Sequence, residues 1–251
     1  MPPPPTPARP APTPPPIVDA IIPALDEEGS LPAVIAAARA AAVLPGGGRL
    51  RHVVVVDNGS TDRTAEVARA AGAVVVGEPR RGYGAACLAG IAWLGALAEP
   101  PSVVVFLDGD GADDAGDLAA LCGPITDGAA DLVVGSRTLG GADRGALTPQ
   151  QRAGNAVAVL CIGLLYRHRY SDLGPLRAVR FSSLTALGMV DRGYGWTVEM
   201  QVKALRRGLR VVEVPVRYHL RTAGRSKVSG TLRGTLGAGW KILATIARHA
   251  F

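Results

Sequence analysis

The segment Val103-Val-Val-Phe-Leu-Asp-Gly-Asp110 joins an apolar run to two carboxylates separated by glycine. The apolar run is typical of a buried strand, and its acidic end would lie at the carboxyl edge of a sheet, where open α/β sheets bind ligands. Two hard oxygen ligands at that edge suit Mg²⁺ or Mn²⁺, and such an ion usually arrives with a phosphate. Taken alone, the motif also fits an acidic loop that caps the next helix.

Two more apolar runs lead into acidic residues. Residues 18–23 are followed by Asp26, Glu27 and Glu28, and residues 52–56 are followed by Asp57. In a parallel sheet these ends share one edge, so we expect the carboxylates to converge on one crevice. Burying like charges together is costly unless a cation or hydrogen-bond donors compensate. The convergence therefore favours a metal-and-nucleotide site.

Short apolar strands alternate with helical segments through the first half of the chain. We expect strands at 18–23, 52–56, 74–76, 103–107 and 132–134, and helices at 30–44, 62–71, about 85–98 and 114–125. Beyond residue 135 we expect helices at 148–166, 198–207 and 230–250, and strands within 172–179 and at 210–216. The alternation predicts an α/β fold, with a mostly parallel central sheet and helices on both faces.

The 251 residues suffice for one large α/β domain. More than half of residues 1–16 are proline, which predicts a disordered tail without the apolar core of a secretory signal. The longest apolar stretch, 153–166, lies between two arginines and is too short to cross a bilayer. Three scattered cysteines without pairing or metal spacing suggest reduced thiols, so we expect a cytoplasmic protein.

Charge is divided unevenly along the chain. Residues 1–130 carry eight Lys/Arg and fifteen Asp/Glu, a net charge of −7, whereas residues 131–251 carry nineteen and six, a net charge of +13. The acidic half suits a metal, and the basic half suits phosphates, anionic lipid or nucleic acid. Arginines that are simply solvated remain the alternative for the basic half.

Five motifs together resemble the family 2 glycosyltransferases of GT-A fold. They are Pro23-Ala-Leu-Asp-Glu-Glu28, Val54-Val-Val-Asp-Asn-Gly-Ser-Thr-Asp62, Phe106-Leu-Asp-Gly-Asp110, Gly135-Ser-Arg137 and Arg221-x-x-x-Arg225-Ser-Lys227. Their order and spacing are most similar to the branch of dolichyl-phosphate mannose synthase and other polyprenyl-phosphate glycosyltransferases. The resemblance covers about residues 17–228 and implies a Rossmann-like nucleotide-binding half followed by an acceptor half. Residues 229–251 would then form a basic amphipathic helix, compatible with peripheral membrane contact or with packing on the domain.

The resemblance also implies positions that bind a UDP- or GDP-linked sugar. They are Pro23, Leu25, Glu28, Asp57, Arg81, Gly82, Asp108 and Gly109. Glu28 would contact the base or ribose, and Asp57 the base. Backbone N–H groups of the Arg81–Gly84 loop would meet the diphosphate at a helix start. Asp110 would ligate Mg²⁺ or Mn²⁺, with Asp108 on the ribose or a metal-bound water.

Two positions depart from the family pattern, because Asp26 stands where Asn is usual and Asn58 where a second Asp is common. Both departures leave the preferred donor base open. Asp113 and Asp114, which follow the motif around Asp110, are expected to cap a helix rather than to bind the ion.

On the acceptor side, the resemblance implies that Ser136 and Arg137 face an acceptor phosphate. A basic loop would meet a donor or lipid phosphate, and it comprises Arg221, Arg225 and Lys227.

A hydroxyl acceptor would need a general base, for which Asp172 and Glu199 are the candidates. Glu199 also lies beside Trp196, an aromatic side chain that can stack on sugar. Either acid fits equally the neutralisation of nearby basic side chains, and a phosphate acceptor would need no base.

We therefore expect an inverting, metal-dependent glycosyltransferase. Lipid phosphate is one of the candidates for its acceptor. A sugar nucleotidyltransferase is a second hypothesis, but its first loop would be glycine-rich and basic, whereas this loop is Leu25-Asp-Glu-Glu28. A non-catalytic basic binding module is a third. Aromatic residues make up only 4% of the chain, so few side chains are available to stack on bases, and we expect no nucleic-acid partner.

Overall fold

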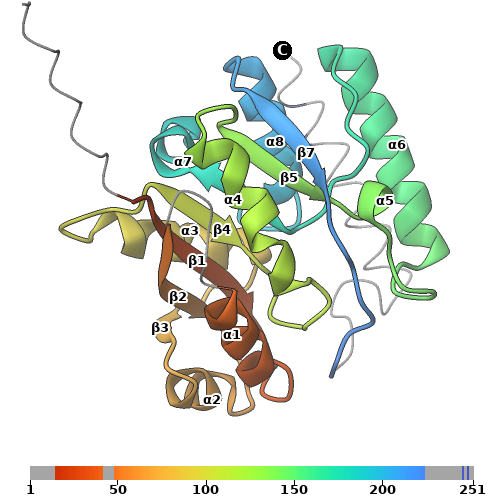
Figure 1. The fold of residues 1–251 in the computed structure, drawn as a ribbon. Helices are drawn as coiled ribbons and strands as arrows, with labels where there is room; N and C mark the ends of the chain where they lie inside the picture. The colour runs from red at the N-terminus through yellow and green to blue at the C-terminus, as the bar shows by residue number, and fades with distance from the viewer. Residues whose placement is uncertain (1–14, 42–47, 224–244, 246–247, 249–251) are drawn as a thin grey trace, which may run out of the picture.

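The computed structural model describes residues 15–41 and 48–223, together with Thr245 and Arg248. Within these residues lies a seven-stranded sheet with the strand order β3-β2-β1-β4-β6-β5-β7 (Figure 1). The strands are Ile17–Ala24 (β1), Arg49–Asp57 (β2), Val74–Gly77 (β3), Val103–Phe106 (β4), Leu132–Ser136 (β5), Arg177–Arg180 (β6) and Val211–Pro215 (β7).

Most of the sheet is parallel, as the sequence predicts. Strands β3, β2, β1 and β4 are parallel neighbours, and β5 pairs in parallel with β7. Only β6 is antiparallel, between β4 and β5. It begins at Arg177, after the loop that the sequence predicts, and in that loop the N–H groups of Ser171 and Asp172 donate to the Glu213 carboxylate rather than to a neighbouring strand.

Helices follow the strands with boundaries close to the predicted ones. They are Leu31–Ala40 (α1), Thr64–Ala70 (α2), Tyr83–Gly95 (α3), Leu118–Thr126 (α4), Arg137–Gly140 (α5), Pro149–Tyr166 (α6), Phe181–Leu187 (α7) and Trp196–Arg206 (α8), with a 3₁₀ turn at Ala115–Asp117 (η2). The predicted helices do not include α5, whose four residues are too short to show a helical period, or the seven-residue α7, which follows β6 directly. Helix α6 starts after Thr148, whose hydroxyl accepts from the Gln151 N–H.

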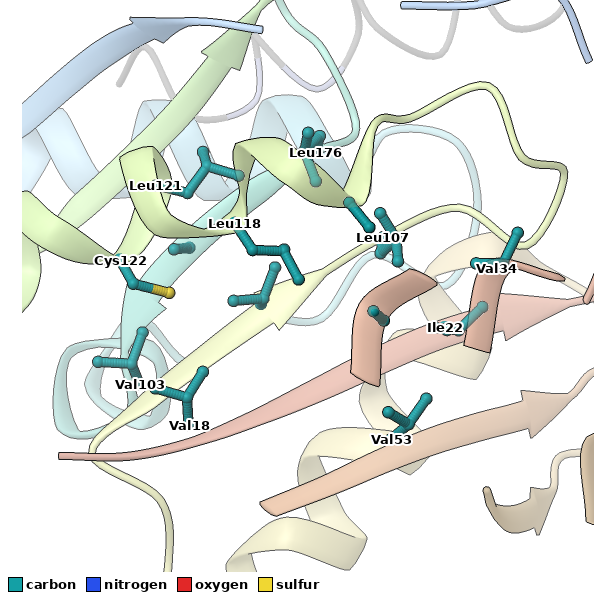
Figure 2. Close-up of a cluster of buried hydrophobic side chains, with 14 of the residues drawn as sticks. Val18, Ile22, Val34, Val53, Val103, Leu107, Leu118, Leu121, Cys122 and Leu176 are labelled. Carbon is teal, nitrogen blue, oxygen red and sulfur yellow. The ribbon is translucent and has the colours of Figure 1, made fainter. Parts of the chain in front are cut away.

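Alternate residues of the strands enter two cores, one on each face of the sheet. Ile22, Val53 and Val105 pack with α1 and α4 on one face, and part of this cluster is shown in Figure 2. Ile21 and Val104 pack on the other face, against α3, α7 and α8. Each of these five side chains is almost fully buried, which stabilises the fold by about 1.5–3 kcal/mol per side chain. The packing of the two cores fixes the position of the sheet edge at which the strands end.

Several sequence predictions concern residues that the structure does not describe. The proline-rich tail lies there except for positions 15 and 16, as do Arg225, Lys227 and nearly all of the predicted helix at 230–250. Among the helices within 15–41 and 48–223, none has an apolar stretch long enough for a membrane span.

Candidate functional site

A cleft of about 420 Å³ opens where β1, β2 and β4 end. Its lining residues come from six parts of the chain that the fold brings together. They are Pro23, Ala24, Leu25, Glu27, Asn58, Arg81, Gly82, Tyr83, Ala86, Asp108, Gly109, Asp110, Tyr194 and Arg221. Carboxylates from the ends of β1 and β4 therefore do meet at one edge of the sheet.

Arg221 is the cation that balances these carboxylates. Its Nη2 lies 2.7 Å from Asp110 Oδ2, and its Nη1 lies 3.4 Å from Glu27 Oε1. Both acids are buried, whereas the arginine side chain is partly exposed to the cleft. The next residue, Thr222, donates its N–H and its hydroxyl to the carbonyl of Asp110. The chain near residue 221 is thus held against the end of β4 by charge and by hydrogen bonds.

Asp108 is the partly exposed acid of the Asp108-Gly-Asp110 motif. The pKa of its carboxyl is raised to about 7, first by desolvation and then by the neighbouring charge of Asp110, while a hydrogen bond from Tyr83 opposes the rise. In that bond the Tyr83 hydroxyl donates to Asp108 Oδ1 across 3.1 Å. A carboxylate that resists ionisation beside another acid is one whose charge a bound cation would stabilise.

Asp113 and Asp114 behave differently from each other. Asp114 caps η2 as predicted, because its Oδ1 accepts from the Gly116 N–H at 2.8 Å. Asp113 is not a helix cap, which corrects the prediction. Its Oδ2 accepts from the Asp108 N–H at 3.0 Å, and its buried Oδ1 has no hydrogen-bond partner among the described residues. Asp113 therefore fixes the backbone of Asp108.

Asn58 holds the loop that forms one wall of the cleft. Its Nδ2 donates to the carbonyls of Glu78 and Arg80 at 2.9 and 2.8 Å, and its Oδ1 accepts from the Gly82 N–H at 2.7 Å. The side chain is buried and uses both functions of its amide. An aspartate cannot make the two donations, which explains why Asn stands at this position.

Two of the four backbone N–H groups in the predicted phosphate-binding loop, residues 81–84, are already bonded within the protein. The N–H of Gly82 donates to Asn58, and those of Gly84 and Ala85 donate to the carbonyls of Gly193 and Arg192. A Cβ on Gly82, whose φ is +147°, would lie 2.1 Å from the carbonyl oxygen of Arg192. Glycine is needed for this close approach of two loops, which leaves Arg81 to supply charge at the cleft.

The other acids of the first two loops serve the loops themselves. Asp26, with a φ of +49°, accepts from the Thr61 N–H at 2.7 Å, and Glu28 accepts from the Arg63 N–H at 3.1 Å. Asp57 accepts from the Ser60 N–H at 3.0 Å. None of these three acids lines the cleft, so the predicted contacts of Glu28 and Asp57 with a nucleoside remain predictions.

The predicted acceptor-side residues lie together, away from the cleft lining. Asp172 Oδ2 accepts from the N–H and Nε of Arg137, and its Oδ1 accepts from Arg137 Nη2 and the Leu173 N–H, all within 2.9 Å. These four bonds fill the accepting capacity of a buried carboxylate. Ser136 is buried and bonded to Ser171 and Leu139. The arrangement speaks against Asp172 as a base and favours its alternative role, the neutralisation of an arginine.

Glu199 and Trp196 also have structural roles, because their side chains are buried against other parts of the protein. Glu199 is fully buried, accepts from the N–H groups of Val190 and Asp191, and pairs with Lys203 Nζ at 2.6 Å. It is therefore better suited to hold the loop before α8 than to reach an acceptor. Trp196 is fully buried against Phe106, with ring centroids 4.7 Å apart, so it does not stack on a sugar as the sequence suggests.

The sequence motifs do not single out several cleft residues. Tyr83 lies within the glycine-rich loop and gains its role only through contact with Asp108, while Tyr194 lies far from every motif. The only local signal for Tyr194 is its position as an exposed tyrosine between two glycines, Gly193 and Gly195.

The family profile described as Glycosyl transferase family 2 matches residues 19–188. An uncharacterised glycosyltransferase of Mycobacterium tuberculosis is 43% identical over 231 residues, which cover 90% of this chain and 98% of the relative. An undecaprenyl-phosphate mannosyltransferase of Micrococcus luteus is 31% identical, with 85% of this chain and 88% of the relative covered.

Among solved structures, glucosyl-3-phosphoglycerate synthase from Mycobacterium tuberculosis, in complex with Mn²⁺, uridine diphosphate and phosphoglyceric acid, has the same fold. The TM-score is 0.73 at 24% sequence identity, and the match covers 94% of this chain and 78% of that one. The expected GT-A fold is thereby confirmed.

We predict that Asn58→Asp destabilises the protein by about 2–4 kcal/mol. The buried carboxylate would face two carbonyl oxygens, and the two hydrogen bonds that the Asn58 amide donates to them would be lost. Urea unfolding would measure the change. The matched control is Asn155→Asp, because Asn155 supplies Oδ1 as the acceptor for the Leu173 N–H, and an aspartate keeps that bond. Equal stability of the two variants would contradict the role assigned to Asn58.

Proposed function

The chain belongs to glycosyltransferase family 2, and we propose that it transfers a sugar from a nucleoside-diphosphate donor to a phosphate-bearing acceptor with the help of Mg²⁺ or Mn²⁺. The observation that carries the proposal is the cleft at the ends of β1 and β4, where Asp108, Asp110 and Glu27 meet Arg221 and Arg81. Acids and arginines in one cleft suit a ligand that combines a cation with a diphosphate.

The metal would be held by Asp110 and Asp108. Within the described part of the chain, no three His, Cys, Asp or Glu side chains form a cluster that would hold an ion alone. Mg²⁺ and Mn²⁺ do not need such a cluster, because one or two carboxylates and the phosphates of a substrate suffice. Bound there, the ion would offset the negative charge of the departing nucleoside diphosphate.

Arg221 would change partners when the metal and donor bind. It now balances Asp110 and Glu27 as the local cation. With Asp110 holding a divalent ion, the guanidinium would be free at the rim of the cleft to bind two oxygens of a diphosphate. Arg81 would contribute a second positive charge from the opposite loop.

The class of acceptor is inferred from whether any carboxylate remains available to act as a general base. The carboxylates of the cleft lining are those of Glu27, Asp108 and Asp110. The proposed metal would use the two aspartates, and Glu27 is buried and accepts from the Ser30 hydroxyl. Asp172 and Glu199 are buried and fully engaged. A phosphate acceptor is already ionised and needs no base, so it suits a cleft in which no carboxylate among the described residues is free for that task.

In the proposed reaction an acceptor phosphate oxygen attacks the anomeric carbon, and the bond from that carbon to the donor diphosphate breaks. Attack opposite the leaving group inverts the configuration, as the sequence resemblance implies. One relative supports a phosphate as the attacking group, because it is named for undecaprenyl phosphate, and a solved neighbour holds phosphoglyceric acid, which supports a phosphate-bearing acceptor more generally. Whether the phosphate belongs to a lipid or to a small metabolite decides between a peripheral membrane enzyme and a freely diffusing cytoplasmic one.

We predict that one nucleoside-diphosphate sugar raises the melting temperature only when Mn²⁺ or Mg²⁺ is present. A thermal-shift screen of UDP- and GDP-linked sugars would identify it. Asp110→Ala should abolish the metal-dependent rise, whereas Asp114→Asn, in the same loop but outside the cleft lining, should retain it. Wild-type metal-dependent transfer by Asp110→Ala would disprove the metal assignment.

We further predict that Mn²⁺ binding weakens as the pH falls below about 7. The raised pKa of Asp108, about 7, means that the folded protein keeps a proton there which the ion must displace. Affinity at pH 6 should be roughly tenfold lower than at pH 8, measured by calorimetry with the stabilising nucleoside-diphosphate sugar present. Tyr83→Phe removes the hydrogen bond that lowers this pKa, so its transition should move to higher pH. Equal affinities at pH 6 and pH 8 would refute the assignment.

A further inference from the structure

Helix α6 presents large apolar side chains to solvent. The exposed fractions are 50% for Val157, 62% for Leu160, 74% for Leu164 and 51% for Leu165. These four residues account for half of the large apolar side chains that are exposed in the described part of the chain. Single exposed leucines are ordinary on protein surfaces, but four on one helix form a patch that requires an explanation.

The four side chains share one face of the helix. At roughly 100° per residue, positions 157, 160, 164 and 165 fall within somewhat more than a third of the helix circumference. The opposite face, with Ala158 and Ile162, is buried against Val198, Val202 and Tyr170. Helix α6 therefore has its own core contact on one side and an uncovered apolar face on the other. It runs along one edge of the molecule in Figure 1.

A groove of about 530 Å³ lies beside this face. Leu160 and Leu164 line it from the helix together with Val159, and Arg169 and Tyr170 line it from the segment that follows. The groove continues the apolar surface toward Ser171, at the buried network of Ser136, Arg137 and Asp172.

The charge around α6 is exclusively positive in the sequence. No Asp or Glu occurs between Asp143 and Asp172, and the interval contains Arg144, Arg152, Arg167 and Arg169. All four arginines are exposed. The apolar face is thus fringed by cations at both ends of the helix.

We propose that α6 docks on an anionic membrane surface, with its apolar face in the headgroup region and its arginines on lipid phosphates. An apolar helix face fringed by arginines is the pattern of helices that lie in a membrane interface. A second copy of the chain fits less well, because pairing two α6 faces would bring like-charged arginine clusters together. The inference does not rest on the proposed function, since docking requires neither donor nor metal.

Co-sedimentation with vesicles tests the proposal. The full chain should bind vesicles of phosphatidylcholine containing about a third phosphatidylglycerol, and bind vesicles of phosphatidylcholine alone much more weakly. Leu160→Ser with Leu164→Ser should weaken binding to the anionic vesicles by at least about tenfold, as should Arg152→Gln with Arg167→Gln and Arg169→Gln. Val190→Ser is the matched control, because Val190 is similarly exposed but lies outside α6, and it should bind as the wild type does.

Near-ultraviolet circular dichroism would verify that each variant is folded, without reference to enzymatic activity. Absence of wild-type binding to anionic vesicles, or undiminished binding by both the leucine and the arginine variants, would overturn the proposal. It would also be overturned if light scattering showed a dimer that the leucine variant dissociates while vesicle binding is unchanged, because α6 would then be an interface between two copies.

Discussion

Asp110 and Glu27 are both buried at the end of the sheet, and neither would be stable there as an anion without a nearby cation. Arg221, from the far end of the described chain, supplies it with one nitrogen to each acid. This three-residue contact joins the first loop, the end of β4 and the segment after β7. The contact holds these three parts together around the cleft, and we propose that a metal and a diphosphate replace its charges when a donor binds.

The walls of the cleft are fixed by side chains that bond to backbone groups of distant loops. Ser30 donates to the carbonyl of Gly109 at 2.8 Å, and the Glu27 N–H donates to the hydroxyl of Thr64 at 2.8 Å. Asn58 does the same for the loop before α3. Such bonds leave the ends of β1, β2 and β4 little freedom, and for the proposed ligands a preformed site would reduce the entropy lost on binding.

The sequence predicts the strands and the edge at which they end, because apolar runs and the acids that follow them are local features. It predicts the convergence of Glu27, Asp108 and Asp110 for the same reason. It does not predict that Arg137 saturates Asp172 or that the Gly84 N–H bonds to Gly193, because these partners are far apart in the chain. The burial of Trp196 is not predicted either, because the sequence pattern of an aromatic residue near an acid is the same whether the aromatic side chain is buried or exposed.

We propose that a divalent ion replaces Arg221 on Asp110 when the donor binds. Anomalous diffraction from crystals grown with Mn²⁺ and the best-stabilising nucleoside diphosphate would locate the ion. We expect a manganese peak bonded to Asp110, with the Arg221 guanidinium turned from that carboxylate to the diphosphate. Manganese bound elsewhere, or an unbroken Arg221–Asp110 pair beside bound nucleotide, would contradict it.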